Sequence, residues 1–479
     1  MKRPIAVLAA LAAVIAPTTT LAPPASAATG CRVDYSVASQ WQGGFQANVK
    51  ITNLGDALSG WTLGFDFTDA GQKLTQGWNA TWAQSSAHVT AQSVGWNGSL
   101  TTGASTSIGF TGTVTGANPA ATKFTLNGTA CNGDPGGDPG TGTGALDRVS
   151  TPGRTQVGSD ALKFSWPGTY FEGRFRGTGV GVVLNDPAAD YEVQVDGRTA
   201  RTLVTPAAGT HWVNGLTDAE HTVRLVKRNE STWATSSFGG FVAAAGGTIL
   251  AKPAARTRQI EFIGDSHTAG YGNLSTSRDC TGDQVNRTTN TDQAFSALTA
   301  RGLNADYQVN AFSGRGMVRN YNGGEPGTSY RTYYDRALLA VDGDVWQKPA
   351  SWRPQLVVVG LGINDFSTAL NPGEKWSTPE ALVADYKAAY HGFLDKLRTR
   401  YGTGTTIVVI GTQGSTAFTT SAQQVVSERN SRGDDRVRYW YQDNSGLDLL
   451  GCHWHPSLHD HQLIAQRLGS FISTLPLTW

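Results

Sequence analysis

The segment from residue 132 to residue 144 constrains the fold most, because it reads Asn-Gly-Asp-Pro-Gly-Gly-Asp-Pro-Gly-Thr-Gly-Thr-Gly. It has no apolar side chain that a core could bury, and glycine and proline dominate it, which is typical of a linker. The chain has 479 residues, about three times the usual domain length of roughly 150. The sequence therefore predicts a multidomain protein with a linker at residues 132–145.

The N-terminus has the pattern of a secretory signal peptide. Lys2 and Arg3 precede an apolar run over residues 5–16, and small residues at 25–27 provide a cleavage site. The run is shorter than the ~20 residues that a membrane-spanning helix needs. We expect a secreted, extracellular protein that loses residues 1–27 and has no membrane partner.

Residues 28–131 are predicted to form a β-sandwich. Alternating patterns at 46–51 and 61–67 predict strands that Gly and Asn turns separate. Only eight of the 101 residues from Cys31 to Cys131 are charged, and the whole chain has 38 Lys+Arg against 37 Asp+Glu, a net charge of +1. This balance argues against a nucleic-acid partner, which would need a basic face.

The chain beyond the linker changes its pattern near residue 257. From 146 to 256, strand patterns predict a second β-sandwich, the accessory domain. From 257 to 479, short apolar strands alternate with helices, which predicts an α/β domain with a parallel, flavodoxin-like sheet. The predicted strands of this C-terminal domain are 260–263, 307–311, 356–359 and 407–410. Its predicted helices include one that begins at a capping box of Ser377 and Glu380, and one at 460–475.

Residues suited to catalysis follow the predicted parallel strands, whose carboxyl ends form the crevice where α/β proteins bind ligands. The first strand leads to Gly-Asp-Ser-His-Thr-Ala-Gly at 264–270, which could expose Ser266 as a nucleophile. The next two lead to Ser-Gly-Arg-Gly at 313–316 and Gly-Leu-Gly-Ile-Asn-Asp-Phe at 360–366. Backbone N–H groups and asparagine amides can stabilise an oxyanion. His455 follows within Cys-His-Trp-His-Pro-Ser at 452–457.

These blocks, in this order, resemble those of the SGNH hydrolases, and the preceding sandwich and the Cys-x-x-His-Pro-Ser string resemble carbohydrate esterase family two. The resemblance implies a jelly-roll accessory domain and an enzyme that removes acetyl groups from polysaccharides such as xylan and mannan, with no cofactor. It implies Ser266 as nucleophile and His455 as general base. It also implies an oxyanion site formed by the N–H groups of Ser266 and Gly314 and the amide of Asn364.

One position departs from the SGNH pattern. An aspartate usually stands three residues before the histidine, or two before it in some family-two members, but these positions are Cys452 and His453 here. We therefore predict a Ser266–His455 dyad, in which the backbone carbonyl of His453 or Trp454 fixes the histidine tautomer. Asp448, the remaining nearby carboxylate, is the alternative.

The same residues allow other interpretations. Ser266 could cap a helix, Asp265 and Asp365 could be the paired acids of a glycosidase, and the histidines at 453, 455, 459 and 461 could bind zinc. The other blocks favour a nucleophile, and each aspartate adjoins a block residue, which favours structural support. The histidines lack the spacing of a closed zinc site, so we expect no metal. Trp454 is expected to support the site, and Trp376 and Trp454 are candidates for contacts with the sugar.

Export makes disulfides possible, and the four cysteines allow three pairings. We favour Cys31 with Cys131 and Cys280 with Cys452, because each pair then lies within one domain. The second bridge would tie the loop that follows Ser266 to the loop that carries His455.

The domain at 28–131 is similar to the family-two carbohydrate-binding modules from Cys31 to Cys131. The similarity rests on Gln-Trp at 40–41, Gly-Trp-Thr-Leu at 60–63, Gln-Gly-Trp-Asn at 76–79 and Gly-Trp-Asn-Gly at 95–98. It implies a flat platform for cellulose made of Trp41, Trp78 and Trp96, since sugar rings stack on aromatic faces. Polar, turn-like neighbours favour exposure of these three, whereas Trp61 is expected in the core and Trp82 stays open.

Together these observations predict a secreted, monomeric acetyl esterase that acts on acetylated hemicellulose, either xylan or glucomannan, while its N-terminal module anchors it to cellulose. An SGNH esterase, lipase or acyltransferase for another acyl group is the first alternative. A cellulose-binding protein without catalysis is the second.

Overall fold

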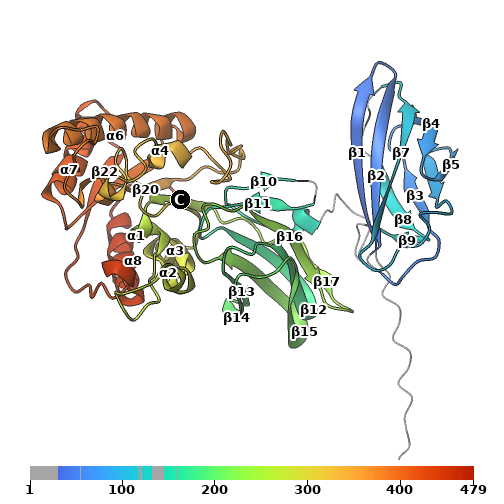
Figure 1. Ribbon diagram of the computed structural model, residues 1–479, viewed down its shortest axis with the longest axis horizontal. Helices are drawn as coiled ribbons and strands as arrows, with labels where there is room; N and C mark the ends of the chain where they lie inside the picture. Colours follow the sequence, from blue (N-terminus) through green and yellow to red (C-terminus); the bar gives the residue numbers. More distant parts are fainter. Residues whose placement is uncertain (1–30, 54, 117, 119–120, 132–144, 159) are drawn as a thin grey trace, which may run out of the picture. The chain divides into compact units, whose positions relative to one another are not determined.

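A computed structural model describes residues 31–479 except 54, 117, 119–120, 132–144 and 159. The predicted signal peptide, and all of the predicted linker except Ala145, lie outside the described residues. The chain divides into two compact units, Met1–Asn132 and Gly133–Trp479. Each has its own hydrophobic core, and the second holds both the accessory and the C-terminal domain (Figure 1).

The N-terminal unit is a sandwich of two antiparallel sheets, of order β1-β2-β7-β4 and β5-β6-β3-β8-β9. Phe65 of one sheet stacks on Phe110 of the other, with ring centroids 5.9 Å apart. Trp61 is 2% exposed, as expected for a core residue, and a disulfide joins Cys31 to Cys131. The strands are β1 Cys31–Trp41, β2 Gly44–Asn53, β3 Thr62–Asp66, β4 Lys73–Trp78, β5 Thr81–Ser85, β6 His88–Gln92, β7 Ser105–Thr113, β8 Thr122–Leu126 and β9 Thr129–Ala130.

The accessory domain is an antiparallel sheet of order β10-β11-β16-β12-β15-β13-β14, with β17 also paired to β12. Its two long strands, β12 and β15, shift register between Gly177 and Gly179, and such bulges bend a sheet. Phe171 and Phe238 stack in its core, 4.3 Å apart. The elements are η1 Ala145–Arg148, β10 Gln156–Val157, β11 Leu162–Phe164, β12 Tyr170–Asn185, β13 Tyr191–Val195, β14 Arg198–Leu203, β15 Gly209–Lys227, β16 Ser236–Ala243 and β17 Thr248–Ile249.

The C-terminal domain is built on a parallel sheet of order β19-β18-β20-β21-β22. This is the doubly wound order of flavodoxin, so the predicted α/β fold is confirmed. The strands are β18 Arg258–Gly264, β19 Ala305–Ala311, β20 Leu356–Gly360, β21 Thr406–Thr412 and β22 Val437–Gln442. The helices are α1 Ser266–Ala269, α2 Gly282–Thr288, η2 Thr291–Gln293, α3 Phe295–Gly302, η3 Tyr321–Gly323, α4 Tyr330–Tyr333, α5 Ile363–Phe366, α6 Pro379–Tyr401, α7 Thr416–Ser431, η4 Cys452–Trp454 and α8 Leu458–Ile472.

Helices cover both faces of this parallel sheet (Figure 1). Val357 and Val409 belong to the core that includes α6 and α7. Their neighbours Val358 and Val408 belong to the core that includes α3 and α8. Because both faces are buried, the middle strand β20 is apolar throughout as Leu-Val-Val-Val-Gly. The neighbouring strands β18 and β19 also carry buried polar side chains, among them Glu261 and Asp306.

Two helices begin at residues other than those predicted. Thr378 caps α6, with its hydroxyl accepting from the N–H of Ala381 at 3.2 Å, so the predicted capping box of Ser377 and Glu380 is wrong. Pro379 takes the first helical position, which needs no N–H donor. The last helix starts two residues earlier than predicted, at Leu458.

Ion pairs join the accessory domain to the C-terminal domain. Arg154 Nη2 lies 2.7 Å from Oε1 of Glu261, and both side chains are fully buried. At the amino end of β19, Arg256, the last residue of the accessory domain, donates two bonds of 2.9 Å to Glu172 of the same domain and contacts Asp306 of β19 at 2.7 Å. A buried charge is costly unless its counter-charge lies beside it. The Arg154–Glu261 pair therefore fixes how the two domains dock.

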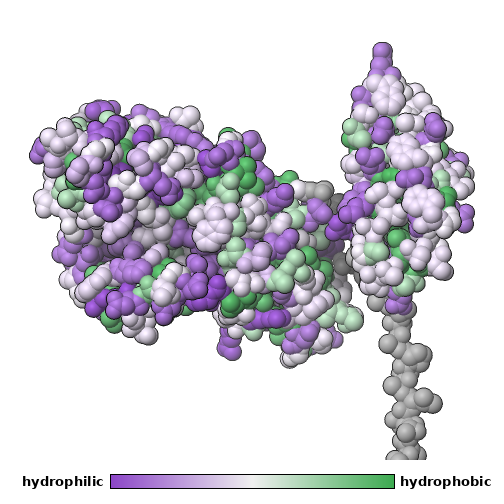
Figure 2. All heavy atoms as spheres, in the orientation of Figure 1, coloured by the Kyte–Doolittle hydropathy of each residue, from purple (hydrophilic) through white to green (hydrophobic). Residues whose placement is uncertain are grey.

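The surface drawn in Figure 2 carries hydrophilic residues on both units, with apolar ones scattered among them. No helix in the described part of the chain is long and apolar enough to cross a membrane.

Candidate active site

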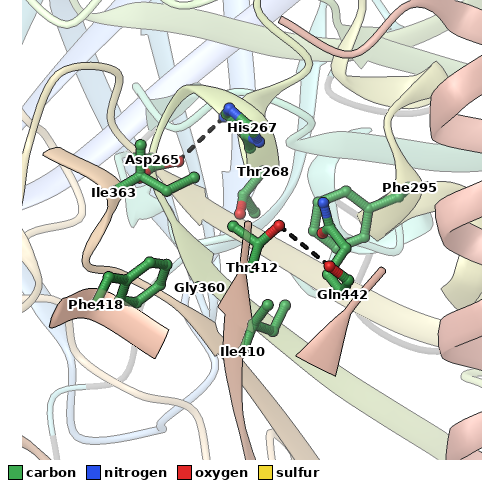
Figure 3. A pocket seen from close by; sticks show the side chains of 10 residues that line it. All are labelled: Asp265, His267, Thr268, Phe295, Gly360, Ile363, Ile410, Thr412, Phe418 and Gln442. Carbon is green, nitrogen blue, oxygen red and sulfur yellow. Dashed lines mark hydrogen bonds between the residues drawn. The ribbon is translucent and has the colours of Figure 1, made fainter. Parts of the chain in front are cut away.

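Ser266 stands at a tight turn between β18 and α1, at the carboxyl edge of the parallel sheet. Gly264 is needed there, because a Cβ atom on it would lie 2.0 Å from Oγ1 of Thr268. Asp265 caps the helix, with Oδ1 accepting from the N–H of His267 at 3.1 Å (Figure 3). The turn leaves Ser266 only 7% exposed. Beside Asp265 and His267 lies a cavity of about 20 Å³, which has room for a water molecule and not for a sugar.

His455 faces the serine from the segment that follows η4. Its Nε2 lies 2.8 Å from Oγ of Ser266, and its Nδ1 lies 2.9 Å from the carbonyl oxygen of Cys452 and 3.2 Å from that of His453. Carbonyl oxygens only accept, so Nδ1 carries the hydrogen and Nε2 accepts from the serine hydroxyl. The backbone carbonyls beside Nδ1 are therefore those of Cys452 and His453, and the carbonyl of Trp454, the other predicted candidate, does not take this place.

The backbone before His455 is bent so that these two carbonyls point at the ring. His453 and Trp454 have φ of 52° and 64°, in the left-handed region that non-glycine residues seldom adopt. A disulfide between Cys280 and Cys452 anchors the turn. The His453 ring bridges the carbonyl of Cys280 at 3.0 Å and the hydroxyl of Tyr271 at 3.0 Å. These contacts stabilise the otherwise unfavourable backbone conformation at His453 and Trp454, which directs the two carbonyls at the His455 ring.

The proton affinity of His455 is low. Burial lowers the pKa of His455 to about 4; the bonds to the two carbonyls raise it in part, and the neighbouring His453 lowers it. The ring is therefore neutral at neutral pH, with a free lone pair on Nε2, as a general base requires.

Asp448 is engaged away from His455. Its Oδ1 accepts from the N–H of Leu450 at 2.9 Å, and its Oδ2 lies 3.7 Å from Nδ1 of His459. Both ring nitrogens of His455 have partners without it. The geometry thus contains a serine–histidine pair oriented by the backbone.

The glycine and asparagine blocks converge on the serine turn. Gly314 follows β19 with φ of 76°, a left-handed conformation that favours glycine. Asn364 lies in α5, directly after β20, and its Nδ2 donates to Oδ2 of Asp265 at 3.1 Å and to the carbonyl of Arg315 at 3.0 Å. Asn364 therefore links the turn that carries Ser266 to the loop that carries Gly314.

The two aspartates beside the block residues have structural partners. Burial raises the pKa of Asp265 to about 7, although the N–H of His267 lowers it. Burial also raises the pKa of Asp365 to about 6, although three backbone N–H groups donate to its carboxylate. These donors are Met317, Val318 and Arg319, at 2.8–2.9 Å. Asp365 thus holds the segment that follows Gly316.

The histidines of the C-terminal cluster do not converge. His461 accepts from the N–H of Phe295 at 3.1 Å, whereas His453 and His455 bind the partners described above. The ligand atoms of Asp448, His459 and Asp460 do lie within 4.8 Å of one another. The Asp460 carboxylate, however, already accepts the N–H groups of Asp448, Leu449 and Ser457, and so holds the loop before α8.

Two aromatic residues and an arginine lie near His455. Trp454 is 64% exposed, and the Arg278 guanidinium lies 3.8 Å from its ring centroid. The Tyr271 ring lies 4.5 Å from that of His455. A separate groove of about 510 Å³ is lined by Trp376 and by the loop after Val318. Sequence reasoning missed Tyr271 and Arg278, because nothing in their local pattern distinguishes them from ordinary loop residues.

Trp41, Trp78 and Trp96 of the N-terminal unit, together called the tryptophan face below, are 52%, 36% and 71% exposed. Trp41 and Trp78 end the two edge strands, β1 and β4, of one sheet. A Cβ atom on Gly44 would lie 2.5 Å from the Trp41 ring, and one on Gly109 would lie 2.2 Å from the Trp78 ring. Glycine therefore lets these rings lie against the backbone.

Trp82, whose position the sequence did not decide, is half-buried and packs against the core of this unit. Its ring packs on Phe110 with centroids 5.2 Å apart, and its Nε1 donates to the carbonyl of Trp78 at 3.3 Å.

The order of the parallel strands and the serine–histidine contact at their carboxyl ends define a protein of the SGNH hydrolase class. Family models match the three parts of the chain in turn. Residues 31–131 match the Cellulose binding domain, residues 151–253 the Carbohydrate esterase 2 N-terminal domain, and residues 260–445 the GDSL-like Lipase/Acylhydrolase.

Individual relatives agree with these matches. The acetylxylan esterase / glucomannan deacetylase of Cellvibrio japonicus is 41% identical over 331 residues, which are 69% of this chain and 90% of that protein. A solved carbohydrate esterase, described as having divergent catalytic and non-catalytic binding functions at its active site, is 37% identical with a TM-score of 0.64; the match covers 68% of this chain and 98% of that one. A family two carbohydrate esterase from Clostridium thermocellum, in complex with cellohexaose, is 30% identical with a TM-score of 0.61 and the same coverage.

The chain therefore belongs to carbohydrate esterase family two. It is a carboxylic ester hydrolase that carries a cellulose binding domain before its accessory and catalytic domains.

Proposed function

We propose that the protein is exported and removes acetyl groups from xylan or glucomannan by a Ser266–His455 mechanism while the tryptophan face anchors it to cellulose. The observation that carries the mechanism is the 2.8 Å contact between Nε2 of His455 and Oγ of Ser266, with Nδ1 on backbone carbonyls. The similarity to an acetylxylan esterase / glucomannan deacetylase supports the choice of substrates. The pattern of residues 1–27 supports export.

In the first half-reaction, Oγ of Ser266 attacks the acetyl carbonyl carbon while Nε2 of His455 takes the hydroxyl proton. The N–H groups of Ser266 and Gly314 and the amide of Asn364 stabilise the oxyanion of the tetrahedral intermediate. The C–O bond to the sugar then breaks, and His455 gives its proton to the leaving sugar oxygen. Water, activated by the same histidine, hydrolyses the acetyl-serine to acetate and restores the enzyme.

The Asn364 amide has to exchange a hydrogen bond before it can donate to the oxyanion. An amide nitrogen has two hydrogens, and both are directed at acceptors, Oδ2 of Asp265 and the carbonyl of Arg315. Donation to the oxyanion therefore exchanges one of these bonds for a bond to substrate. The Asp265 bond is the one we expect to be exchanged, because the pKa of about 7 lets this carboxyl become neutral and weaken as an acceptor.

The backbone carbonyls replace the triad aspartate in orienting His455. They fix the tautomer in which Nε2 is free, as an aspartate does. As neutral groups they stabilise the imidazolium less than a carboxylate would, in line with the lowered pKa of His455. The proposed dyad thus keeps the geometry of a triad without its negative charge.

Anchoring is proposed from the three exposed tryptophans. Pyranose faces stack on flat aromatic rings, and rings that lie against the backbone of Gly44 and Gly109 are already held in place before they bind. Binding to cellulose in plant walls would keep the esterase close to acetylated hemicellulose in the same wall.

The test is acetate release from acetylated xylan, acetylated glucomannan and acetylated cellulose, measured side by side with the wild type and with Ser266→Ala. We expect release from at least one hemicellulose and a loss of about 10⁴-fold or more in kcat with Ser266→Ala. A series of 4-nitrophenyl esters of increasing chain length should show activity falling steeply beyond acetate. Equal activity on long acyl chains would favour a lipase, and wild-type turnover no greater than that of Ser266→Ala would favour a non-catalytic binding protein.

A further inference from the structure

A carboxylate of the accessory domain reaches the catalytic edge, which is the carboxyl edge of the parallel sheet where Ser266 and His455 lie. Glu230 lies in the segment between β15 and β16, and its Oε1 accepts the N–H of Ser313 at 2.8 Å. Its Oε2 accepts the Ser313 hydroxyl. One side chain from one domain thus takes both hydrogens that Ser313 can donate, and Ser313 directly precedes Gly314.

The oxyanion loop, residues 313–315, is held from its other side by the catalytic domain itself. The N–H of Tyr321 donates to the carbonyl of Gly314 at 2.9 Å, and Asn364 donates to the carbonyl of Arg315 at 3.0 Å. Both of these bonds hold carbonyl groups. On the N–H side of the loop, Arg315 donates to the carbonyl of Phe312 at 3.3 Å, and Glu230 binds the N–H of Ser313, just before the left-handed turn at Gly314.

The segment that carries Glu230 is fixed to the catalytic domain at neighbouring residues. The carbonyl of Arg228 accepts from the N–H of Thr291 at 2.7 Å, and Nδ2 of Asn229 donates to the carbonyl of Asn286 at 3.1 Å. Burial is the main cause of the raised pKa of Asp265, and the negative charges of Asp365 and Glu230 add to it. The Glu230 carboxylate is therefore rigidly placed and within electrostatic reach of the nucleophile turn.

We infer that Glu230 is a positioning residue for ester hydrolysis: by binding Ser313 it aims the N–H of Gly314 at the oxyanion, so the accessory domain completes the active site. This inference rests on the proposed Ser266–His455 mechanism. It also assigns the accessory domain a part in catalysis besides any part in binding polymer. A displacement of the Gly314 donor weakens a bond that forms only in the transition state, so the loss falls on kcat and leaves KM nearly unchanged.

The test uses the full-length protein with 4-nitrophenyl acetate. We expect Glu230→Ala to lower kcat about 10- to 100-fold, less than the full loss of an oxyanion donor, with KM changed less than about threefold. Glu230→Gln should recover part of the loss, because its amide oxygen still accepts one hydrogen from Ser313. A merely structural role would lower the melting temperature without this division between kcat and KM.

Glu172→Ala is the matched control. Glu172 is also an accessory-domain carboxylate at the domain junction, but it binds Arg256 at the amino end of β19, opposite to the end that leads to Ser313. We expect a lower melting temperature and a kcat within about twofold of wild type. A wild-type kcat for Glu230→Ala, or an equal loss of kcat for Glu172→Ala, would overturn the inference.

A second variant keeps the inference testable even if the Glu230→Ala protein does not fold. Ser313→Ala deletes the hydroxyl bond from the other side of the contact, so Glu230→Gln should cost less in that background than in the wild type. Independent, multiplicative effects would contradict the inference. If the wild type itself releases no acetate, the proposed function fails; if it does and both Glu230 variants match it, only this inference fails.

Discussion

The catalytic edge of the C-terminal domain and the tryptophan face of the N-terminal domain differ in their exposure to water. At the catalytic edge, Ser266 is 7% exposed, and burial moves the pKa of His455 down to about 4 and that of Asp265 up to about 7. On the tryptophan face, Trp41 and Trp96 are 52% and 71% exposed. Charged residues are also sparse in that domain, at eight of 101.

This difference reflects what each surface has to do. Groups that move protons gain from desolvation, which shifts pKa values and strengthens every hydrogen bond to a developing charge. Rings that stack on a polymer need no shifted pKa, but they have to be exposed and held in place beforehand. We therefore expect that a substitution on either surface leaves the function of the other unchanged.

After Ser266→Ala, the largest effect is expected from Asn364→Ala. Losing one oxyanion donor costs about 3–4 kcal/mol of barrier, so kcat should fall about 100- to 1000-fold. Retention on microcrystalline cellulose should not change. Steady-state kinetics on 4-nitrophenyl acetate and a cellulose pull-down of the same sample measure the two quantities. Unchanged turnover would remove Asn364 from the site, and weaker retention would break the independence of the two surfaces.

The converse change is the triple variant of Trp41, Trp78 and Trp96 to alanine. Each stacking contact contributes about 1 kcal/mol, and these energies add. Losing all three should therefore weaken retention on cellulose roughly 100-fold. The kcat on a soluble acetyl ester should stay at the wild-type value. Trp82→Phe, at a half-buried ring that packs against the core of the same domain, serves as the control that keeps retention. A triple variant that is retained like the wild type would refute the tryptophan face as the anchor.

The contrast also shows how far the sequence could predict this molecule. Ser266, Gly314 and Asn364 could be placed together because each follows a parallel strand, and carboxyl ends of neighbouring strands meet at one edge. The carbonyl of Cys452 could not be named, because its direction depends on left-handed backbone at His453 and Trp454, which such residues seldom adopt.

The sequence pattern also could not predict contacts between segments that are distant along the chain. Glu230 and Ser313 are 83 residues apart, and neither belongs to a motif that would pair them. The cap of α6 was misplaced by one residue because Ser377 and Thr378 are both good N-cap residues, and only the path of the chain selects Thr378. Periodicity and motifs therefore locate a site, whereas tertiary contacts decide how it is held.

A smaller effect is expected from pH. His455 has to be neutral to accept the serine proton, and its pKa of about 4 means that it gains a proton only as pH falls through about 4. Between pH 7 and pH 5 the kcat/KM should change less than about twofold, whereas a histidine with the usual pKa near 6.5 would lose about 25-fold. The same profile for Asp265→Asn controls for that carboxyl, which also changes protonation in this range. An acid limb near pH 6.5 in both proteins would contradict the lowered pKa.

A comparably small effect is expected from Asp448→Asn. The substitution keeps an Oδ1 acceptor for the N–H of Leu450 and removes only the charge that faces His459. If backbone carbonyls orient His455, kcat should stay within about threefold of wild type, and the melting temperature should hardly move because an exposed ion pair contributes little. Replacing the aspartate of a true triad costs about 10⁴-fold in kcat, so a loss on that scale would show that Asp448 swings to His455 during turnover and that the dyad is wrong. The threefold and 10⁴-fold outcomes are too far apart to be confused, which makes this nearly silent variant the sharpest test of how the catalytic histidine is held.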